Sequence, residues 1–463
     1  MVYSMDNKHD TLIIIALPLQ GLPTGGYIRA YNVLMHLDNI LQEHGFKVEL
    51  YTPPSIILSI LLPKGSDEAY KMLNIITNNL KPFLKRYDTF NSLFDYIINY
   101  IINQYEKYKR FSSYKILQKI ITYPFLYLYK MKRIEENIVR KYSSIIKGHV
   151  AAIYSMHENM SPLISAKYFS LSTKAPILIM LQLNPYIEVR LKKEIIYSPK
   201  YLGTWLFSTS TKKIYADLAK SKILRLIMAV SPAPLLETPS LVDIIRRNNI
   251  YTYIPKPSNA YDSELINQRN AHKDPCLVTY FGRLTLFKGL YDILKIWKII
   301  ENNISCARFQ IIGKFDSYIY KYNFFNLIKR LKLRNIKYLG YISHGPRLYQ
   351  AVSKASILLY PSYQDSFSLT VLEAIALGLV VVAYDIPALR YIYSGLPNVF
   401  LVPPGNVREL ASRVISLLKR GDLSDLVNNE KVAKFLELYG SWRHVAEAEA
   451  RAILHVLKRY NRG

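Results

Sequence analysis

The sequence predicts an α/β protein with two domains, each built on a doubly wound parallel sheet. At 463 residues the chain exceeds the usual size of a single hydrophobic core. From residue 276 onward, short apolar or β-branched runs alternate with segments of helical period. The first half shows the same alternation more loosely, and strands that alternate with helices are typical of parallel sheets covered by helices.

Five runs in the first half are predicted strands, and a long segment interrupts them. The strands are TLIIIALP (11–18), KVELYTP (47–53), VAAIYSMH (150–157), APILIMLQ (175–182) and LIMAVS (226–231). Residues 60–148 form a connection much longer than a normal crossover, and we predict a helical insert there. The insert holds 16 Lys or Arg against 7 Asp or Glu, with many Tyr. Three interpretations stay open: a solvated helical surface, a surface for anionic lipid, or one for nucleic acid.

The second half repeats the pattern more regularly. Its predicted strands are CLVTYFG (276–282), ARFQIIG (307–313), IKYLGYI (336–342), ILLYPS (357–362), LVVVAYD (379–385) and NVFLVPP (398–404). The helices predicted between them begin near residues 289, 322, 345, 369 and 407.

The boundary between the domains is expected at residues 255–275, where Pro, Asn, Ser and charged residues replace apolar periodicity. We therefore predict an N-terminal domain over residues 1–265 and a C-terminal domain over residues 266–425. Residues 426–463 are predicted to form helices that pack back across the boundary.

The charge balance predicts anionic partners. Lys and Arg number 61 against 34 Asp and Glu, a formal net charge of +27. The positive electrostatic field of such a chain attracts nucleic acid, an anionic membrane surface or phosphorylated substrates. No apolar run approaches the roughly 18 residues that a membrane span needs, and the first apolar run is too late and too short for a secretory signal. We expect a cytoplasmic protein.

The two cysteines, Cys276 and Cys306, have no His or Cys partner at metal-ligand spacing. Neither a zinc site nor a disulfide framework is therefore indicated. Buried thiols and a single bridge between the two both stay open.

Ligands of open α/β sheets bind beyond the carboxyl ends of the strands, so the residues that follow each strand are the candidates. After the first strand, Gly25 and Gly26 precede a helical pattern, which lets backbone N–H groups approach a ligand closely. A plain strand-to-helix turn explains the pair equally well. After VAAIYSM, His157 can bond a sugar hydroxyl, although a lone His is more often structural.

Two cations follow the strand CLVTYFG, namely Arg283 and Lys288, and Lys288 precedes a glycine and a helix. Cations at the start of a helix interact unfavourably with the helix dipole. A role in binding a diphosphate therefore explains these two residues better than a role in stabilising the helix. The alternative is two solvated surface cations in a very basic protein.

Two carboxylates flank a helix start after the strand ILLYPS. Asp365 lies in the loop and Glu373 in the helix that begins near Leu369. Helix amides at Ser368, Leu369 and Thr370 would point at an anion, and the carboxylates would accept bonds from hydroxyls on either side of it. A nucleotide sugar has that order of groups. The alternative is a capping box with Thr370 as N-cap, which explains Glu373 alone.

These segments resemble glycosyltransferase family 4, the retaining, nucleotide-sugar-dependent enzymes of the GT-B architecture with two Rossmann-like domains. The resemblance covers most of residues 11–55 and everything from residue 150. It rests on DSFSLTVLE with the following AIALGLVVVAYDIPALRY, on YFGRLTLFKGLYDIL, on QIIGK and on LVPPGNVRELASRVISLL. HENMSPLISA is similar to the His-Glu-Pro-Asn segment of membrane-associated mannosyltransferases of the family.

The resemblance implies a role for each candidate residue. Arg283 and Lys288 would hold the donor diphosphate, and Asp365 would bond hydroxyls of the transferred sugar. Glu373 would bond the ribose hydroxyls and His157 would face the donor sugar. The glycine-rich loop of the family would correspond to Gly25 and Gly26. Asp365 stands where the family usually has Glu, Ser368 where many members have Gly, and Gln182 where many have a second His.

The implied activity is transfer of a sugar from a nucleotide-diphosphate sugar with retention, by a front-face displacement that needs no metal and no cofactor. The expected acceptor is a glycan, glycolipid or lipid-linked saccharide at a membrane, approached through the insert. A phosphorylase or epimerase on the same architecture is one alternative. A non-catalytic nucleic-acid-binding protein is the other, although no reader module is present.

Overall fold

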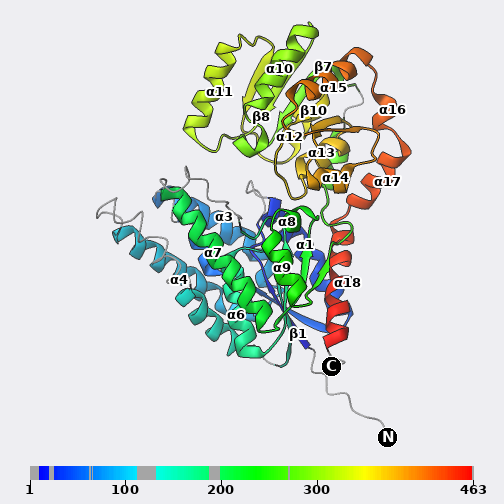
Figure 1. Cartoon of the computed structure of the whole chain (residues 1–463). Coiled ribbons are helices and arrows are strands. Elements are labelled where there is room, and N and C mark those ends of the chain that lie inside the picture. Colours follow the sequence, from blue (N-terminus) through cyan, green and yellow to red (C-terminus); the bar gives the residue numbers. More distant parts are fainter. Residues whose placement is uncertain are drawn as a thin grey trace. The chain divides into compact units, whose positions relative to one another are not determined.

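The structure, a computed structural model, describes residues 10–19, 25–61, 64, 66–111, 132–146, 148–186, 199–269 and 272–460. The chain divides into two compact units (Figure 1). Unit one is formed by Met1–Val230, Pro234–Lys256 and Ala446–Gly463, and unit two by Ser231–Ala233 and Pro257–Val445.

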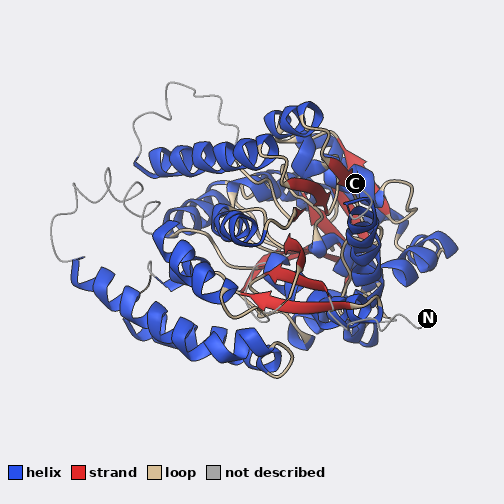
Figure 2. Ribbon diagram, turned by 90° about the horizontal axis from the view of Figure 1, so that it is seen from below, coloured by secondary structure: helices blue, strands red, loops and turns tan. Residues whose placement is uncertain are grey.

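Unit one is built on a six-stranded parallel sheet with the strand order β2-β1-β3-β4-β5-β6. The strands are β1 (Asp10–Ile15), β2 (Phe46–Tyr51), β3 (Val150–Ser155), β4 (Ile177–Leu181), β5 (Leu224–Ala229) and β6 (Tyr251–Tyr253). β3 and β4 are buried along their whole length, as central parallel strands are when helices cover both faces. Figure 2 shows helices around the strands.

The helices of this half of the chain include the predicted insert. They are α1 (Gly25–Glu43), α2 (Pro54–Leu61), α3 (Ser66–Leu84), α4 (Asp88–Phe111), a helix over 132–143, α6 (Met160–Thr173), α7 (Pro199–Lys220), α8 (Ala233–Leu236) and α9 (Pro239–Arg247). The insert is therefore helical where it is described, as predicted; its residues 112–131 lie outside the described part of the chain. Within the described residues, no helix combines the length and apolarity needed to cross a membrane.

A buried carboxylate attaches the insert to the rest of unit one. Glu135, on the helix over 132–143, accepts hydrogen bonds from the Tyr51 hydroxyl (2.7 Å), the Ser165 hydroxyl (2.7 Å) and the Ser55 N–H (2.9 Å). Burial raises its pKa, and the donated hydrogen bonds oppose that rise. The inner face of the insert is thus held by specific polar contacts as well as by apolar packing.

The last helix of the chain, α18 (Trp442–Tyr460), contributes to the core of unit one. Its Glu449 is fully buried and forms an ion pair with Arg29 of α1, which is also buried. The Tyr154 hydroxyl of β3 donates to the second carboxylate oxygen of Glu449 at 2.5 Å. A buried charge needs such partners, so these contacts fix α18 against the first helix and the central strand.

Unit two is built on a second six-stranded parallel sheet, in the order β12-β11-β10-β7-β8-β9. Its strands are β7 (Asp274–Phe281), β8 (Arg308–Ile312), β9 (Ile336–Gly340), β10 (Ala355–Tyr360), β11 (Val380–Tyr384) and β12 (Val399–Val402). Its helices are α10 (Asp292–Asn303), α11 (Tyr318–Arg330), α12 (Pro346–Ser353), α13 (Leu369–Ala376), α14 (Pro387–Tyr393), α15 (Val407–Arg420), α16 (Ser424–Val427) and α17 (Glu430–Tyr439), with 3₁₀ turns η2 (Ser263–Gln268) and η3 (Leu286–Lys288). The predicted fold class, two doubly wound parallel α/β sheets, is confirmed.

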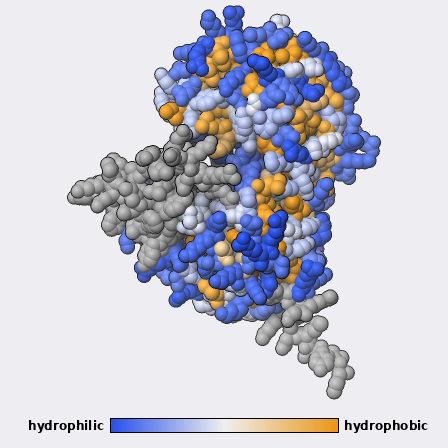
Figure 3. Space-filling model, in the orientation of Figure 1, coloured by the Kyte–Doolittle hydropathy of each residue, from blue (hydrophilic) through white to orange (hydrophobic). Residues whose placement is uncertain are grey.

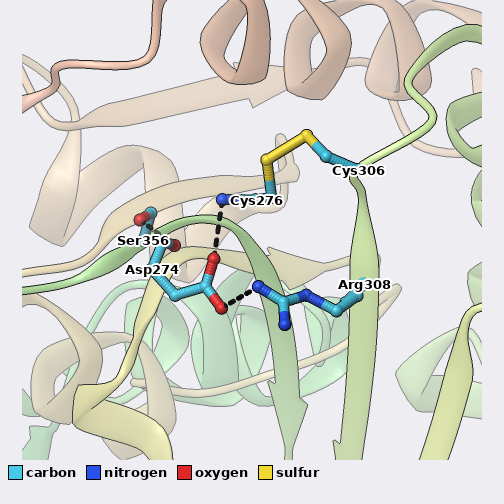
Figure 4. Close-up of a disulfide and its surroundings, with 5 residues drawn as sticks. All are labelled: Asp274, Cys276, Cys306, Arg308 and Ser356. Carbon is cyan, nitrogen blue, oxygen red and sulfur yellow. Dashed lines mark hydrogen bonds and ion pairs between the residues drawn. A yellow bond between two sulfur atoms is a disulfide. The ribbon is translucent and has the colours of Figure 1, made fainter.

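A disulfide joins Cys276 and Cys306 at the amino end of β7 (Figure 4). Cys276 is the third residue of β7 and Cys306 precedes β8, and these strands are neighbours in the sheet. Asp274 accepts a hydrogen bond from the Cys276 N–H at 3.0 Å and pairs with Arg308 of β8. The Ser356 hydroxyl of β10 donates to the Asp274 carbonyl at 2.6 Å. The bridge left open by the sequence is therefore present.

The surface of the described residues is mixed. On the face shown in Figure 3, hydrophilic residues predominate and smaller hydrophobic patches interrupt them. This distribution is ordinary for a folded protein, since much of any protein surface is apolar.

Candidate functional site

The residues predicted in the C-terminal half gather at the carboxyl edge of the second sheet. β7 and β10 are adjacent strands, so the loops that follow them start side by side. The first loop carries Arg283 and Lys288, and the second carries Asp365 and leads into α13 with Glu373. One sheet edge therefore presents two cations and two carboxylates.

Two glycines allow the loops at this edge to pack closely. Gly289 has φ 71°, and a Cβ there would lie 2.1 Å from the Pro361 carbonyl oxygen. Gly313, after β8, has φ 157°, and its Cβ would lie 1.8 Å from the Gly282 carbonyl oxygen. Any side chain would push these segments apart, so glycine is required at both positions.

Lys288 and Asp365 form an ion pair inside this edge. Lys288 Nζ donates to Asp365 Oδ2 at 2.7 Å, to the Tyr360 hydroxyl at 3.0 Å and to the Gln364 carbonyl at 3.3 Å. The Tyr360 hydroxyl donates to the same Asp365 oxygen at 2.5 Å. Burial alone would raise the pKa of Asp365, but the charge and hydrogen bond of Lys288 and the other donors bring that pKa below its ordinary value. Asp365 is thus ionised at neutral pH.

Arg283 extends from the same loop with an exposed side chain. Its backbone carbonyl accepts a hydrogen bond from the Tyr280 hydroxyl at 2.7 Å, which fixes the loop beside β7. Thr370 of α13 faces this loop, since its Oγ1 lies 3.7 Å from the position of a Cβ on Gly282. The guanidinium is the cation of the pair that is open to a ligand, whereas Lys288 is held by Asp365.

The start of α13 differs from the capping box considered for Glu373. The N-cap is Ser368, and Thr370 lies inside the helix, so the Thr370 capping box is wrong. Ser368 has φ 67° and ψ 78°, a left-handed conformation that is costly for a residue with a Cβ. Its carbonyl accepts a hydrogen bond from the Tyr393 hydroxyl at 2.9 Å. That conformation explains why glycine suits this position in the family that the sequence resembles.

Glu373 is bound instead by a histidine that the sequence did not point to. His344 Nε2 lies 2.6 Å from Glu373 Oε1, and the Tyr349 hydroxyl lies 3.1 Å from the same nitrogen. Burial would lower the pKa of His344, but the hydrogen bond and charge of Glu373, and the charge of Asp262, raise it overall. His344 follows β9, which ends at the same sheet edge, so the rule of inspecting residues after each strand would have found it.

The candidates of the first half lie at the carboxyl edge of the sheet of unit one. His157, after β3, is buried, and its Nε2 accepts a hydrogen bond from the Leu17 N–H at 3.2 Å. Burial, and secondarily the charge of Arg29, lower the pKa of His157 to about 3. The imidazole is therefore neutral with its proton on Nδ1, and the Tyr27 ring packs edge-on against it at 5.4 Å between centroids.

Gly26 in the first turn of α1 approaches the same group of residues. A Cβ on Gly26 would lie 3.2 Å from Gln182 Oε1, and the Gln182 amide nitrogen donates to the Met156 carbonyl at 2.6 Å. The Gln182 N–H donates to Glu158 at 3.0 Å. Burial raises the pKa of Glu158 to about 7, against the effect of its backbone hydrogen bonds. Gly25 is the first residue of α1, so His157 and the glycine pair share one edge.

No group of three or more His, Cys, Asp and Glu residues in the described part of the chain has the arrangement of a metal site. The charged residues at the edge of unit two can instead hold an anion directly, through Arg283 and the neighbouring backbone amides.

Residues 262–432 match the family model of glycosyl transferases group 1. The chain is 25% identical over 167 residues to an uncharacterized glycosyltransferase of Haemophilus influenzae, covering 36% of this chain and 46% of the relative. It is 29% identical over 189 residues to an uncharacterized glycosyltransferase of Methanocaldococcus jannaschii, covering 40% of this chain and 47% of the relative. The chain thus spans about half the length of the curated relatives it matches.

The fold of nearly the whole chain resembles that of solved structures, of which two serve as examples. One is Anabaena HepE in complex with UDP, with a TM-score of 0.59, 14% identity and coverage of 96% of this chain and 100% of that one. The other is sucrose-phosphate synthase of Thermosynechococcus elongatus, with a TM-score of 0.58, 13% identity and coverage of 97% and 100%. The predicted GT-B fold is therefore confirmed.

Proposed function

We propose that the protein is a retaining glycosyltransferase of glycosyltransferase family 4, which moves a sugar from a nucleoside-diphosphate sugar to an acceptor. The observation that carries the proposal is the convergence of Arg283, the Lys288–Asp365 pair and the His344–Glu373 pair at one sheet edge. All of them lie within residues 262–432, which match glycosyl transferases group 1.

The charges at this edge suit the departure of a diphosphate. Arg283 binds diphosphate oxygens with its guanidinium fork, and Lys288 adds a point charge that Asp365 holds in position. Negative charge grows on the leaving oxygen as the bond to the anomeric carbon breaks. Two cations stabilise that charge, so a divalent metal is not required by this scheme.

The two carboxylates are proposed to bind hydroxyls at opposite ends of the donor. Asp365 accepts bonds from hydroxyls of the transferred sugar, and Glu373 accepts them from the ribose hydroxyls. His157 of unit one, whose Nε2 accepts the Leu17 N–H, is proposed to face the donor sugar. Gly25 and Gly26 are proposed to contribute backbone groups near the diphosphate.

The transfer is proposed to occur on one face of the sugar. The acceptor oxygen forms a bond to the anomeric carbon as the carbon–phosphate oxygen bond breaks, and the acceptor proton passes to the departing phosphate oxygen. No protein nucleophile takes part, and the configuration is retained.

The acceptor is proposed to be a glycan, glycolipid or lipid-linked saccharide, with the helical insert as the surface that meets an anionic membrane on its cytoplasmic side. Support comes from the composition of residues 60–148, with 16 basic and 7 acidic residues. Vesicle flotation with anionic and neutral lipid tests this part separately from catalysis.

Thermal-shift titration against a panel of nucleotide sugars tests the central proposal, because a ligand that binds only the folded chain raises its stability. UDP-sugars come first, since the structures of HepE contain UDP and UDP-glucose. NMR of the product then gives the anomeric configuration. Binding of no nucleotide sugar, or interconversion of the donor without an acceptor, would contradict transfer.

A further inference from the structure

Glu373 has one carboxylate oxygen engaged by the protein. The only partner of its side chain among the described residues is His344, whose Nε2 lies 2.6 Å from Oε1. The carboxylate is 8% exposed and the imidazole 37% exposed. The buried acid is therefore held from the solvent side of the sheet edge, and Oε2 is left for another donor.

Two elements fix the imidazole itself. His344 lies in the segment between β9 and α12, and Tyr349 of α12 packs edge-on against its ring with 5.2 Å between centroids. The Tyr349 hydroxyl lies 3.2 Å from Nδ1 and 3.1 Å from Nε2. The imidazole ring therefore cannot rotate without breaking its contacts with Glu373 and Tyr349.

We propose that His344 is a positioning residue, which orients Glu373 so that Oε2 accepts hydrogen bonds from the ribose hydroxyls of the donor. The inference rests on the proposed function and adds to it a residue outside the motifs. Glu373 touches the donor, whereas His344 acts through Glu373.

The groups that face His344 favour its cationic form. They are Glu373 of α13 and Asp262 beside η2. Tyr349 of α12 also packs on the ring, and its own pKa is raised by burial and by the charges of Glu373, Asp262 and Glu264. A cationic imidazole donates a charge-assisted hydrogen bond to the carboxylate. Deprotonation at higher pH weakens that bond, so donor affinity should fall as pH rises through the raised pKa of His344.

Steady-state kinetics and donor titration of the full chain test the proposal, with UDP-glucose as the first probe. Loss of a charge-assisted hydrogen bond predicts that His344→Ala raises the donor KM and Kd about 10-fold or more, with kcat changed by less than about 3-fold. His344→Gln keeps an N–H donor and should recover most of the affinity, without the alkaline rise in KM. The matched control is His149→Gln, which removes the histidine of a more exposed His–carboxylate pair, that with Asp10, and should change neither constant.

Each outcome is informative. Wild-type donor affinity and an unchanged pH profile in His344→Ala, with Glu373→Ala impaired, overturn the positioning role and leave the proposed function intact. A wild-type chain that binds no member of the nucleotide-sugar panel overturns both. If His344→Ala unfolds below the assay temperature, His344→Gln decides: the loss of the alkaline KM rise supports the proposal, and its persistence overturns it.

Discussion

Lys288 Nζ lies 2.7 Å from Asp365 Oδ2, so the cation proposed for the diphosphate and the acid proposed for the sugar are each other's counter-ion. Both side chains are less than one-fifth exposed. Removing either one leaves the other charge without its partner in a poorly solvated place.

Lys288→Ala should therefore abolish transfer and also destabilise unit two. We expect a loss of about 100-fold or more in kcat, and about 1–3 kcal/mol in the free energy of unfolding. Lys295→Ala is the control, since Lys295 pairs with Asp292 at 3.3 Å but is more than half exposed, and should cost under about 0.5 kcal/mol. Equal effects of the two substitutions would contradict the assignment.

The same pair predicts acid sensitivity of unit two. The folded pKa of Asp365 lies below its unfolded value, so the stabilisation is present above the unfolded pKa of about 3.9 and is lost as pH falls through the folded one. Urea unfolding between pH 3 and 7 should show a smaller acid loss for Asp365→Asn than for the wild type.

Gly289 should tolerate no side chain. Gly289→Ala places a Cβ 2.1 Å from a backbone oxygen, whereas Gly421, with nearly the same φ of 76°, has nothing within 4 Å of its Cβ position. Both substitutions place alanine at a positive φ, which lowers the free energy of unfolding by about 1 kcal/mol. Only Gly289→Ala should also displace the loop that carries Lys288. Donor affinity should drop in Gly289→Ala and persist in Gly421→Ala; thermal-shift titration measures both.

Glu158 and His157 should give unit one opposite pH dependences. The pKa of Glu158, about 7 when folded, exceeds its unfolded value of about 4.3, so its contribution is fully present below pH 4.3 and falls by about 3 kcal/mol as pH rises to 7. Glu158→Gln should remove that slope in urea unfolding and raise stability at pH 8. A wild-type slope in the variant would contradict the burial argument.

His157 acts in the other direction. Its folded pKa of about 3 lies below the unfolded value of about 6.5, so the unfolded chain binds the proton first and stability falls as pH drops below 6.5. His157→Gln should reduce the loss of unfolding free energy below pH 6.5, while His149→Gln, at an exposed site, should not. Histidine NMR titration of the folded chain is a direct check.

The disulfide should stabilise unit two without affecting its chemistry. Closure of a loop with a sequence separation of 30 residues corresponds to about 3–4 kcal/mol in the chain-entropy description. Cys276→Ser with Cys306→Ser should lower the melting temperature and leave the donor KM unchanged. Reducing agent should reproduce the shift in the wild type and produce none in the double variant.

The strands were predictable because long apolar or β-branched runs leave few alternatives to a buried strand. β6 was missed, since Tyr251–Tyr253 is three residues long and only half buried, too short for a pattern. Local sequence also suggested Thr370 as a cap, because the left-handed backbone of Ser368 leaves no mark in residue types.

Pairwise contacts were less predictable than elements. The bond between Cys276 and Cys306 depends on β7 and β8 being neighbours, which a strand pattern alone does not give. His344 belongs to no motif, and its contact with Glu373 arises because β9 ends at the same sheet edge as β10. The sequence identified residues with distinctive spacing and missed one that acts through a neighbour.

The pairing of Arg29 with Glu449 makes the core of unit one depend on segments far apart in the sequence. Residues near both ends of the chain complete one core, while most of unit two is a continuous stretch between them. During synthesis, unit two can therefore fold before the last helix of unit one has been made. Until that helix is made, Glu449 is missing from the interior around Arg29, and the core of unit one stays incomplete.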